Sequence, residues 1–318
     1  MPAISKQITF ARLGKYWYLY FLVLPSLVLV ATFEYFPAIS AIVHSFFRWN
    51  GDYINDFVGI NNFLEAFRDP VLGYGFTVVG ILILANFVKM IPSIITAVVI
   101  NRLTSPKASY VYKVLFVIPM IIPGMVYLLM WKFFYDPSVG ILNKILSSTG
   151  LLNLLCWIDK IFHWGIFLQG SMPIWLGDAK LIVPSLILWG FPWVGIVGVL
   201  IYIAGLQAID ESVYEAAAID GIGPFRKFTS IELPLILSQV RINMVLMVIG
   251  TLQDYGLMLV LFGTQGGPQG KAMVPGLYMF QMAFQNDRAG YACAVGLIMF
   301  VIIMCLTEIN NRFIRVDK

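Results

Sequence analysis

The sequence predicts an all-α integral membrane protein with about six transmembrane helices and a short helix on its cytoplasmic surface. The first observation is composition: 59% of the 318 residues are hydrophobic, only 12% are charged, and the mean hydropathy is +0.84. A soluble chain of this length could not bury so much apolar surface. A soluble enzyme, a nucleic-acid-binding protein and a disordered chain are therefore disfavoured. The other two observations are six long apolar stretches and one inner loop rich in helix signals.

The six apolar stretches are each long enough to cross a bilayer, since a helix needs about 20 apolar residues to span the hydrocarbon. We expect spans at about 17–43, 74–100, 114–134, 182–205, 240–262 and 290–309. Residues 1–73 are expected to form a tail, the first span and the first outer loop, and residues 74–315 a core of five spans. The first stretch is too long for a cleavable signal peptide, and no small-residue cleavage site follows it.

The distribution of basic residues orients these spans. An even number of spans places both termini on one side of the membrane, and basic residues favour the cytoplasmic side. With both termini inside, the inner segments hold twelve Lys and Arg residues and the outer segments eight. The inner loop 101–113 carries Arg102, Lys107 and Lys113 and no acidic residue. We therefore expect a multi-pass protein of the bacterial cytoplasmic (inner) membrane, in contact with its lipid, with both termini in the cytoplasm.

The largest outer loop, 135–181, contains two apolar pieces at 141–155 and 157–168. Both are shorter than a span, and Lys144, Asp159 and Lys160 interrupt them. We expect amphipathic or interfacial helices here rather than further spans.

Two polar clusters lie within predicted spans. Lys89 stands near the middle of the second span with Asn86 three residues earlier on the same helix face. A mid-span Lys costs on the order of 3 kcal/mol to insert, so it should face protein or water. The fifth span carries the other cluster, Gln253, Asp254 and Tyr255. The five residues either hold the bundle together, through a Lys89–Asp254 ion pair or separate hydrogen bonds, or line a pathway for a polar solute.

Prolines within the spans indicate bends, and the Gly190–Gly195 segment is the best candidate for a deliberate one. His44 and His163 are too far apart for a metal motif, and Cys156, Cys293 and Cys305 form no CxxC pair. We therefore expect no catalytic residue and no metal site.

The inner loop 206–238 carries start and stop signals for a short surface helix. Ser212 and Glu215 have the spacing of a capping box, and Ala216–Ala218 favour helix propagation. Gly221 can end that helix in a left-handed conformation. Pro234 suits the first turn of the helix that leads into the fifth span.

The same loop carries a recognisable pattern: Glu215-Ala216-Ala217, three residues, Gly221, nine residues, and Ile231-x-Leu233-Pro234. This pattern resembles the cytoplasmic signature of binding-protein-dependent ABC importer permease subunits. Four further segments, 204–209, 225–228, 263–268 and 288–292, resemble the carbohydrate, maltose-transporter-like branch of that family. The likeness covers roughly residues 17–315, and residues 153–174 look like extra length in the outer loop.

The resemblance implies the type I ABC importer permease fold, with the short helix as a coupling helix that docks on a separate ATPase. It implies contacts with the ATPase by Tyr214, Glu215, Ala216, Ala217, Asp220, Gly221, Phe225 and Phe228. The implied partners are two ABC ATPase subunits, a second permease subunit that is a different chain, and an extracytoplasmic solute-binding protein. ATP and Mg would bind the ATPase subunits, since this chain has no GxxxxGK[ST] motif and is expected to bind no cofactor and no nucleic acid.

The expected function is therefore that of a non-enzymatic transport subunit, which forms a path for a sugar or oligosaccharide with the second permease. Lys89 raises the hypothesis of an acidic saccharide. Import of a non-sugar solute remains an alternative. A secondary carrier would need a midplane ion site and inverted repeats, and a membrane enzyme would need a nucleophile–base or metal cluster; the sequence displays neither set.

Overall fold

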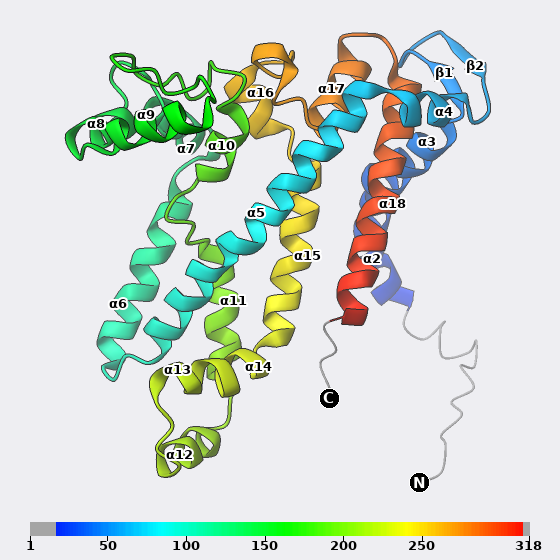
Figure 1. Ribbon diagram of the computed structural model, residues 1–318. Helices are drawn as coiled ribbons and strands as arrows, with labels where there is room; N and C mark the ends of the chain where they lie inside the picture. The colour runs from blue at the N-terminus through cyan, green and yellow to red at the C-terminus, as the bar shows by residue number, and fades with distance from the viewer. Residues whose placement is uncertain (1–16, 314–318) are drawn as a thin grey trace.

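The computed structural model describes residues 17–313, which are mostly helical with one two-stranded sheet (Figure 1). Residues 1–16 and 314–318, which include five of the basic residues used to orient the chain, lie outside the described residues. Three helical stretches are long and apolar enough to cross a membrane without a sharp break: Tyr20–His44, Pro70–Asn101 and Ala289–Arg312. Four bent helix pairs also have the length and composition of a span. All six predicted spans are helical, but three of them are broken.

The first predicted span is present at almost its expected bounds. It consists of α2 (Trp17–Val30), the π-helical η1 (Ala31–Tyr35) and α3 (Phe36–His44). α3 packs against the last helix, whereas α2 exposes its apolar side chains. An antiparallel hairpin of β1 (Phe47–Trp49) and β2 (Asn55–Phe57) follows, with Phe47 opposite Phe57, and then α4 (Asn61–Arg68).

The second span, α5 (Pro70–Asn101), is the longest helix, at 32 residues. At about 1.5 Å per residue it is about 48 Å long. Asp69 caps it, because its carboxylate accepts hydrogen bonds from the N–H groups of Val71 and Leu72. The helix therefore starts four residues earlier than predicted, and the expected boundary between residues 73 and 74 falls inside α5.

The third span differs from the prediction, which placed one helix at 114–134. The structure has α6 (Pro106–Val117), the 3-10 helix η2 (Ile118–Ile121) and α7 (Gly124–Phe134), with a 91° bend before α7. Ser105 caps α6 and Pro106 occupies its first turn. Pro119 and Pro123 remove backbone donors at the bend, which is why the helix does not continue.

The large outer loop forms α8 (Ile141–Ser148) and α9 (Leu151–Phe162), bent by 84° relative to each other. Both are too short to span a bilayer alone, which confirms the expectation of short helices. In Figure 1 they lie at the upper left, beside α7 and α10. Asp159 on the buried face of α9 accepts hydrogen bonds from the Ile166 and Phe167 N–H groups and so fixes the following segment.

The fourth span is α10 (Ile182–Leu188) and α11 (Ile196–Gln207), and the chain leaves helical geometry between them. This confirms the predicted bend at Gly190–Gly195. Gly190 adopts a left-handed φ of 78°, and Phe191–Pro192 is a cis peptide.

The remaining chain forms the inner loop, the fifth span, the third outer loop and the last span. The elements in chain order are α12 (Glu211–Ile219), α13 (Pro224–Lys227), the π-helical η3 (Phe228–Glu232), α14 (Leu233–Leu235), α15 (Leu237–Gln253), α16 (Gly256–Phe262), η4 (Pro268–Gly270), α17 (Pro275–Phe284) and α18 (Ala289–Phe313). The fifth predicted span is broken between α15 and α16, at Asp254 and Tyr255.

Two apolar cores are built along α5. Its first half packs with α17, α18 and α15, and its second half packs with α11 and the start of α15. Figure 1 shows α5 running obliquely from the end of the molecule that carries α17 toward the end that carries α12 and α13. The start of α2 and the end of α18 lie toward the same end as α12.

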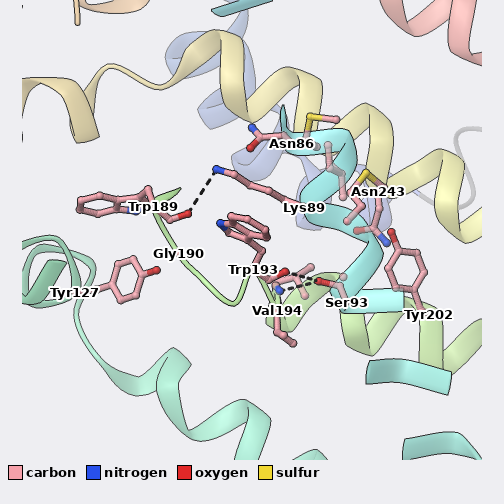
Figure 2. A pocket seen from close by; sticks show the side chains of 16 residues that line it. Asn86, Lys89, Ser93, Tyr127, Trp189, Gly190, Trp193, Val194, Tyr202 and Asn243 are labelled. Atoms are coloured by element: carbon pink, nitrogen blue, oxygen red, sulfur yellow. Dashed lines mark hydrogen bonds between the residues drawn. The ribbon is translucent and has the colours of Figure 1, made fainter. Parts of the chain in front are cut away.

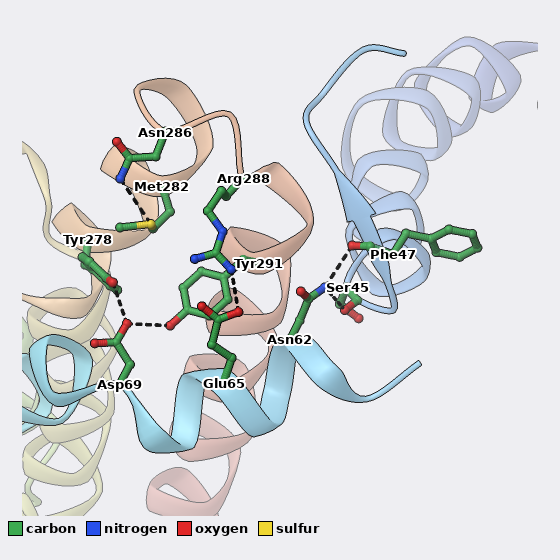
Figure 3. A network of polar contacts seen from close by, with 10 residues as sticks. All are labelled: Ser45, Phe47, Asn62, Glu65, Asp69, Tyr278, Met282, Asn286, Arg288 and Tyr291. Carbon is green, nitrogen blue, oxygen red and sulfur yellow. Dashed lines mark hydrogen bonds and ion pairs between the residues drawn. The ribbon is translucent and has the colours of Figure 1, made fainter. Parts of the chain in front are cut away.

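A polar network joins the outer ends of the helices (Figure 3). The Tyr278 and Tyr291 hydroxyls donate to the Asp69 carboxylate at 2.5 and 2.8 Å, and Arg288 forms an ion pair with Glu65. Burial acts to raise the pKa of Asp69, but the two tyrosine hydroxyls and the capped N–H groups outweigh it and lower the pKa. The network ties the start of α5 to α17 and α18.

Candidate substrate cavity and coupling surface

A cavity of about 510 Å³ lies where α5, α11 and α15 face the non-helical segment of the fourth span (Figure 2). Its wall combines aromatic rings, amide and hydroxyl groups, small residues and one lysine. The lining residues are Asn86, Lys89, Met90, Ser93, Tyr127, Trp189, Gly190, Trp193, Val194, Gly195, Val197, Gly198, Tyr202, Asn243, Leu246 and Met247.

Lys89 reaches from α5 to the end of α10. Its ammonium donates hydrogen bonds to the carbonyl oxygens of Leu186 at 3.2 Å and Trp189 at 3.5 Å. The last carbonyls of a helix lack partners within the helix, and a cation there is also favoured by the helix dipole. Lys89 therefore closes the C-terminal end of α10 and places a positive charge in the cavity wall.

Ser93, one helical turn after Lys89, holds the other side of the same break. Its hydroxyl donates to the Trp193 carbonyl at 3.2 Å and accepts from the Gly195 N–H at 2.8 Å. Trp193 has a φ of 61°, which is rare for a residue with a side chain. Together, Ser93 and Lys89 tether the break to α5 and present Trp193 to the cavity, as Figure 2 shows.

The cavity wall suits a polar, hydroxylated solute. Tyr127, Trp189 and Trp193 supply aromatic faces, while Asn243 and the Asn86 amide supply hydrogen-bonding groups. Asn86 already donates to the Thr251 hydroxyl of α15 at 2.9 Å. A concave site with apolar walls and a few polar groups is typical of small-molecule binding.

The second predicted cluster does not join the first. Gln253, Asp254 and Tyr255 are not among the cavity residues, because the chain breaks between α15 and α16 at this point. Asp254 accepts from the Leu257 N–H at 3.1 Å and so caps α16, and Tyr255 stacks on Phe280 of α17. Of the five polar residues, Asn86 and Lys89 line this cavity and the other three do not, so a pathway shared by all five stays a prediction. Lys89 bonds to carbonyls, so the Lys89–Asp254 ion pair is not the arrangement observed.

Several lining residues were not predicted: Ser93, Tyr127, Trp189, Trp193, Tyr202 and Asn243. A signal was available for two of them, because Trp189 and Trp193 flank the Gly190 and Pro192 that predicted the bend. Ser93 lies four residues after Lys89 and so on the same helix face. Tyr127, Tyr202 and Asn243 come from three other helices, and only the packing brings them together.

The surface helix α12 forms where it was predicted, with a different cap. Asp210, not Ser212, is its N-cap, and its carboxylate accepts from the Ser212 N–H at 2.9 Å. Hydrogen bonds from Ser212 lower the pKa of Asp210. The Ser212–Glu215 capping box is therefore wrong: Asp210 is an equally good cap two residues earlier, and it leaves Glu215 exposed.

The end of α12 confirms the prediction for Gly221, whose φ is 64°. The Gly221 N–H donates to Ala218 and the Ile222 N–H donates to the Ala217 carbonyl, which is the Schellman arrangement. A residue other than glycine would be strained at this φ.

The predicted ATPase-contacting residues divide by exposure. Glu215, Ala216, Asp220, Gly221 and Phe225 are exposed, and Phe225 is 79% exposed.

The other three predicted contacts face inward. Ala217 is only 4% exposed, Tyr214 is half-buried, and Phe228 packs on the inner core. The five exposed residues are therefore the better placed for direct contact, and contact of all eight with an ATPase stays a prediction. A row of alanines gives no periodicity from which to choose the outward face.

Sequence reasoning missed Ile219 at the end of α12. This side chain is 87% exposed, the highest value among the exposed large apolar residues. Ile219 at the end of α12 and Phe225 in α13 are both exposed apolar side chains, on either side of the turn at Gly221.

Comparison with known proteins supplies the family. A family model described as "Binding-protein-dependent transport system inner membrane component" matches residues 81–315, which include α12 and all of the residues that line the cavity.

Relatives of known designation align along almost the whole chain. The multiple sugar-binding transport system permease protein MsmF of Streptococcus mutans is 29% identical, with 92% of each chain covered. The sn-glycerol-3-phosphate transport system permease protein UgpA of Yersinia pestis is 27% identical, with 94% of each chain covered.

Solved structures show the same fold. A chain of a bacterial ABC transporter that imports the acidic polysaccharide alginate superposes with a TM-score of 0.74 at 21% identity, covering 96% of this chain and 98% of that chain. A second structure of such a transporter, with TM-score 0.73, includes a periplasmic protein bound to an alginate pentasaccharide.

Proposed function

Because the chain belongs to the family of binding-protein-dependent transport system inner membrane components, we propose that it is one permease subunit of an ATP-driven importer. In this proposal a second, different permease chain completes the pathway, and an extracytoplasmic binding protein delivers the solute. Two separate ABC ATPases bind the ATP and Mg, and this chain binds no cofactor. The observation that carries the proposal is the pairing of a cavity between α5, α11 and α15 with the exposed surface helix α12.

The exposed face of α12 is the proposed ATPase-docking surface. Ile219 and Phe225 supply apolar contact, and Glu215 supplies a carboxylate for a basic group on the ATPase. Central apolar anchors with a polar rim are the usual anatomy of a protein interface. In this proposal α12 faces the cytoplasm, and the even number of predicted spans implies that both termini do so as well.

The proposed solute is a sugar or oligosaccharide. Support comes from the aromatic and amide groups of the cavity and from relatives named for sugar transport. Within that class we favour an acidic saccharide, because Lys89 places a cation in the wall. The import of the acidic polysaccharide alginate by a transporter of the same fold agrees with this choice.

A second candidate solute is a small phosphorylated polyol. The same cation would serve a phosphate, and a relative is named for sn-glycerol-3-phosphate transport. Both candidate solutes would bring an anionic group to Lys89. They differ in the size of the solute and in the hydrogen-bond donors that would surround its charge.

The test of the transport assignment is uptake into vesicles. The chain, reconstituted with its ATPases, second permease and binding protein, should accumulate solute only when ATP is supplied on the ATPase side. Uptake by the isolated chain without ATP, driven by an ion gradient, would instead indicate a secondary carrier.

The charge assignment has its own test in solute-stimulated ATPase activity. Wild-type and Lys89→Met complexes would be compared with neutral oligosaccharides, acidic oligosaccharides and glycerol 3-phosphate. We expect Lys89→Met to lose stimulation by the anionic solute and to keep any stimulation by neutral ones. Equal losses for both classes would remove the charge-recognition hypothesis.

A further inference from the structure

A charged joint connects the inner end of α5 to the helices that follow α12. Arg102 is the C-cap of α5, and its guanidinium forms a two-point ion pair with Glu232, the last residue of η3. The Nε–Oε1 distance is 3.0 Å and the Nη2–Oε2 distance is 2.6 Å. Nη2 also donates to the carbonyl of Pro224, the first residue of α13, at 2.9 Å. One side chain therefore fastens both ends of the 224–232 segment to α5.

The acidic partner of this joint, which belongs to the inner loop, is fully buried. The Glu232 side chain is 0% exposed, and that of Arg102 is 29% exposed. A buried carboxylate is tolerated only when its charge and lone pairs are satisfied, and the planar guanidinium does both with fixed geometry. The pair therefore specifies how the segment sits on α5.

Tyr214 connects α12 itself to this joint. Lys227 of α13 lies over the Tyr214 ring at 4.4 Å. Burial raises the pKa of Tyr214, the Glu232 carboxylate raises it further, and Arg102 and Asn101 oppose the shift, so the tyrosine lies within the electrostatic reach of the ion pair. An inward-facing residue of α12 thus contacts α13, which Arg102 fastens to α5, and its buried hydroxyl has no hydrogen-bond partner among the described residues.

The same helix α5 carries the cavity residues. Ser93 and Lys89 precede Arg102 by nine and thirteen residues, or about 14 and 20 Å along the helix axis. The inner core of Ile94, Ala97 and Val98 packs this part of α5 against α11. Arg102 is therefore joined by one packed helix to the groups that hold the break of the fourth span.

We propose that the Arg102–Glu232 pair, reached from α12 through Tyr214, is the joint that transmits displacement of α12 to α5 and so to the cavity. This inference rests on the proposed function. Arg102 and Glu232 are positioning residues, since neither lines the cavity nor lies on the exposed face of α12. Loss of the pair should separate ATP hydrolysis from transport rather than abolish both.

The test measures uptake and ATPase activity in the reconstituted complex. Glu232→Gln keeps the side-chain shape and removes the charge. We expect the variant complex to assemble and to keep basal ATPase activity within about twofold, while uptake falls about tenfold. The exchanged pair Arg102→Glu with Glu232→Arg should recover part of the uptake that either single change removes.

A matched control is available in Glu308→Gln. Glu308 pairs with Arg312 on the surface of α18, where both side chains are mostly exposed. Exposed ion pairs contribute little, so uptake and ATPase activity should both stay near wild type.

A second readout follows the cavity directly. With the native cysteines replaced, a cysteine at Val197 in the cavity wall would be labelled with and without ATP. ATP should change the labelling rate in the otherwise wild-type chain and should not change it in Glu232→Gln.

Three outcomes would overturn the inference: wild-type coupling in Glu232→Gln, proportional loss of ATPase activity and uptake, or failure to assemble, since the last two would assign the pair to folding alone. If the wild-type complex itself shows no ATP-dependent uptake, the proposed function fails instead.

Discussion

α5 is held in two places by very different contacts, and the contrast indicates how the two regions work. At its C-terminal end, Arg102 donates two charged hydrogen bonds to the Glu232 carboxylate, which is fully buried. At its middle, Lys89 reaches two neutral carbonyls at 3.2 and 3.5 Å, beside an open cavity wall. The first contact resists displacement, since breaking a buried ion pair by removing one partner costs about 3–5 kcal/mol. The second involves only neutral acceptors and faces the cavity, so we expect that a solute can replace it.

The comparison indicates how motion should travel through this chain. It should enter through the buried Arg102–Glu232 ion pair, which we call the stiff joint, and change the weaker hydrogen bonds of Lys89, which we call the adjustable contact. The stiff joint connects α5 to the loop that carries α12, and the adjustable contact connects α5 to the break in the fourth span. Substitutions in the two regions should therefore have different signatures, and the following four predictions run from the largest expected effect to the smallest.

We expect the largest effect from a substitution on the exposed face of α12, the proposed ATPase-docking surface. Ile219→Asp places a charge at the most exposed apolar position of α12. If this side chain enters an apolar site on the ATPase, an interface anchor of about 2–4 kcal/mol is lost and ATPase association falls by at least about thirtyfold. Co-purification of the ATPase with the permease measures this. Ile219→Val is the matched control, and equal ATPase recovery from the Asp and Val variants would refute the docking surface.

Lys89→Met tests the adjustable contact. Hydrogen bonds to charged groups contribute about 1.5–3 kcal/mol, so uptake of an anionic solute should fall by about ten- to hundredfold. Concentration-dependent uptake should show the loss mainly as a raised half-saturation concentration. Lys89→Arg keeps the charge and should keep most of the affinity. A Met variant with unchanged uptake of the anionic solute would show that Lys89 serves only to close α10.

Ser93→Ala separates the structural role of a cavity residue from the solute-binding role proposed for Lys89. The change removes two hydrogen bonds that hold the Trp193–Gly195 break, each contributing about 1 kcal/mol. We expect a small decrease in the melting temperature of the purified chain, and only a few-fold loss of uptake. Ser93→Thr keeps the hydroxyl and should show a smaller effect than Ser93→Ala. If the Ala variant melts like the wild type, the tether from Ser93 does not stabilise the break.

The smallest expected effect lies at the outer end, where Asp69 receives the hydroxyls of Tyr278 and Tyr291. The folded-state pKa of Asp69 is lowered. The stabilisation is therefore complete above the unfolded pKa of about 3.9 and is lost as the pH falls below it. The melting-temperature difference between wild type and Asp69→Asn should shrink as the pH falls through about 4. Asp56→Asn, which removes an exposed pair with Arg48, should show no such trend.

Much of the fold could be predicted because its signals are local. Gly221 and the alanine run marked α12, and Gly190 and Pro192 marked the break of the fourth span. The third span was misplaced because Lys107 and Lys113 suggested an inner loop, although Ser105 and Pro106 are good helix-start residues.

The site was less predictable because it depends on how broken helices face each other. Asn86 and Lys89 could be found, since charged and amide groups are costly in a membrane. Asp254 is also a charged residue within a predicted span, but its carboxylate caps α16 and does not line the cavity. The Arg102–Glu232 pair joins residues 130 positions apart, and no local pattern predicts such a contact.

The most direct test of the account is whether the cavity holds the solute during transport. In the reconstituted complex with its native cysteines replaced, a cysteine at Leu246 in the cavity wall would be labelled with a maleimide during turnover. The account predicts that the transported solute, with ATP and binding protein present, slows this labelling. An unchanged labelling rate under conditions of measured uptake would contradict it.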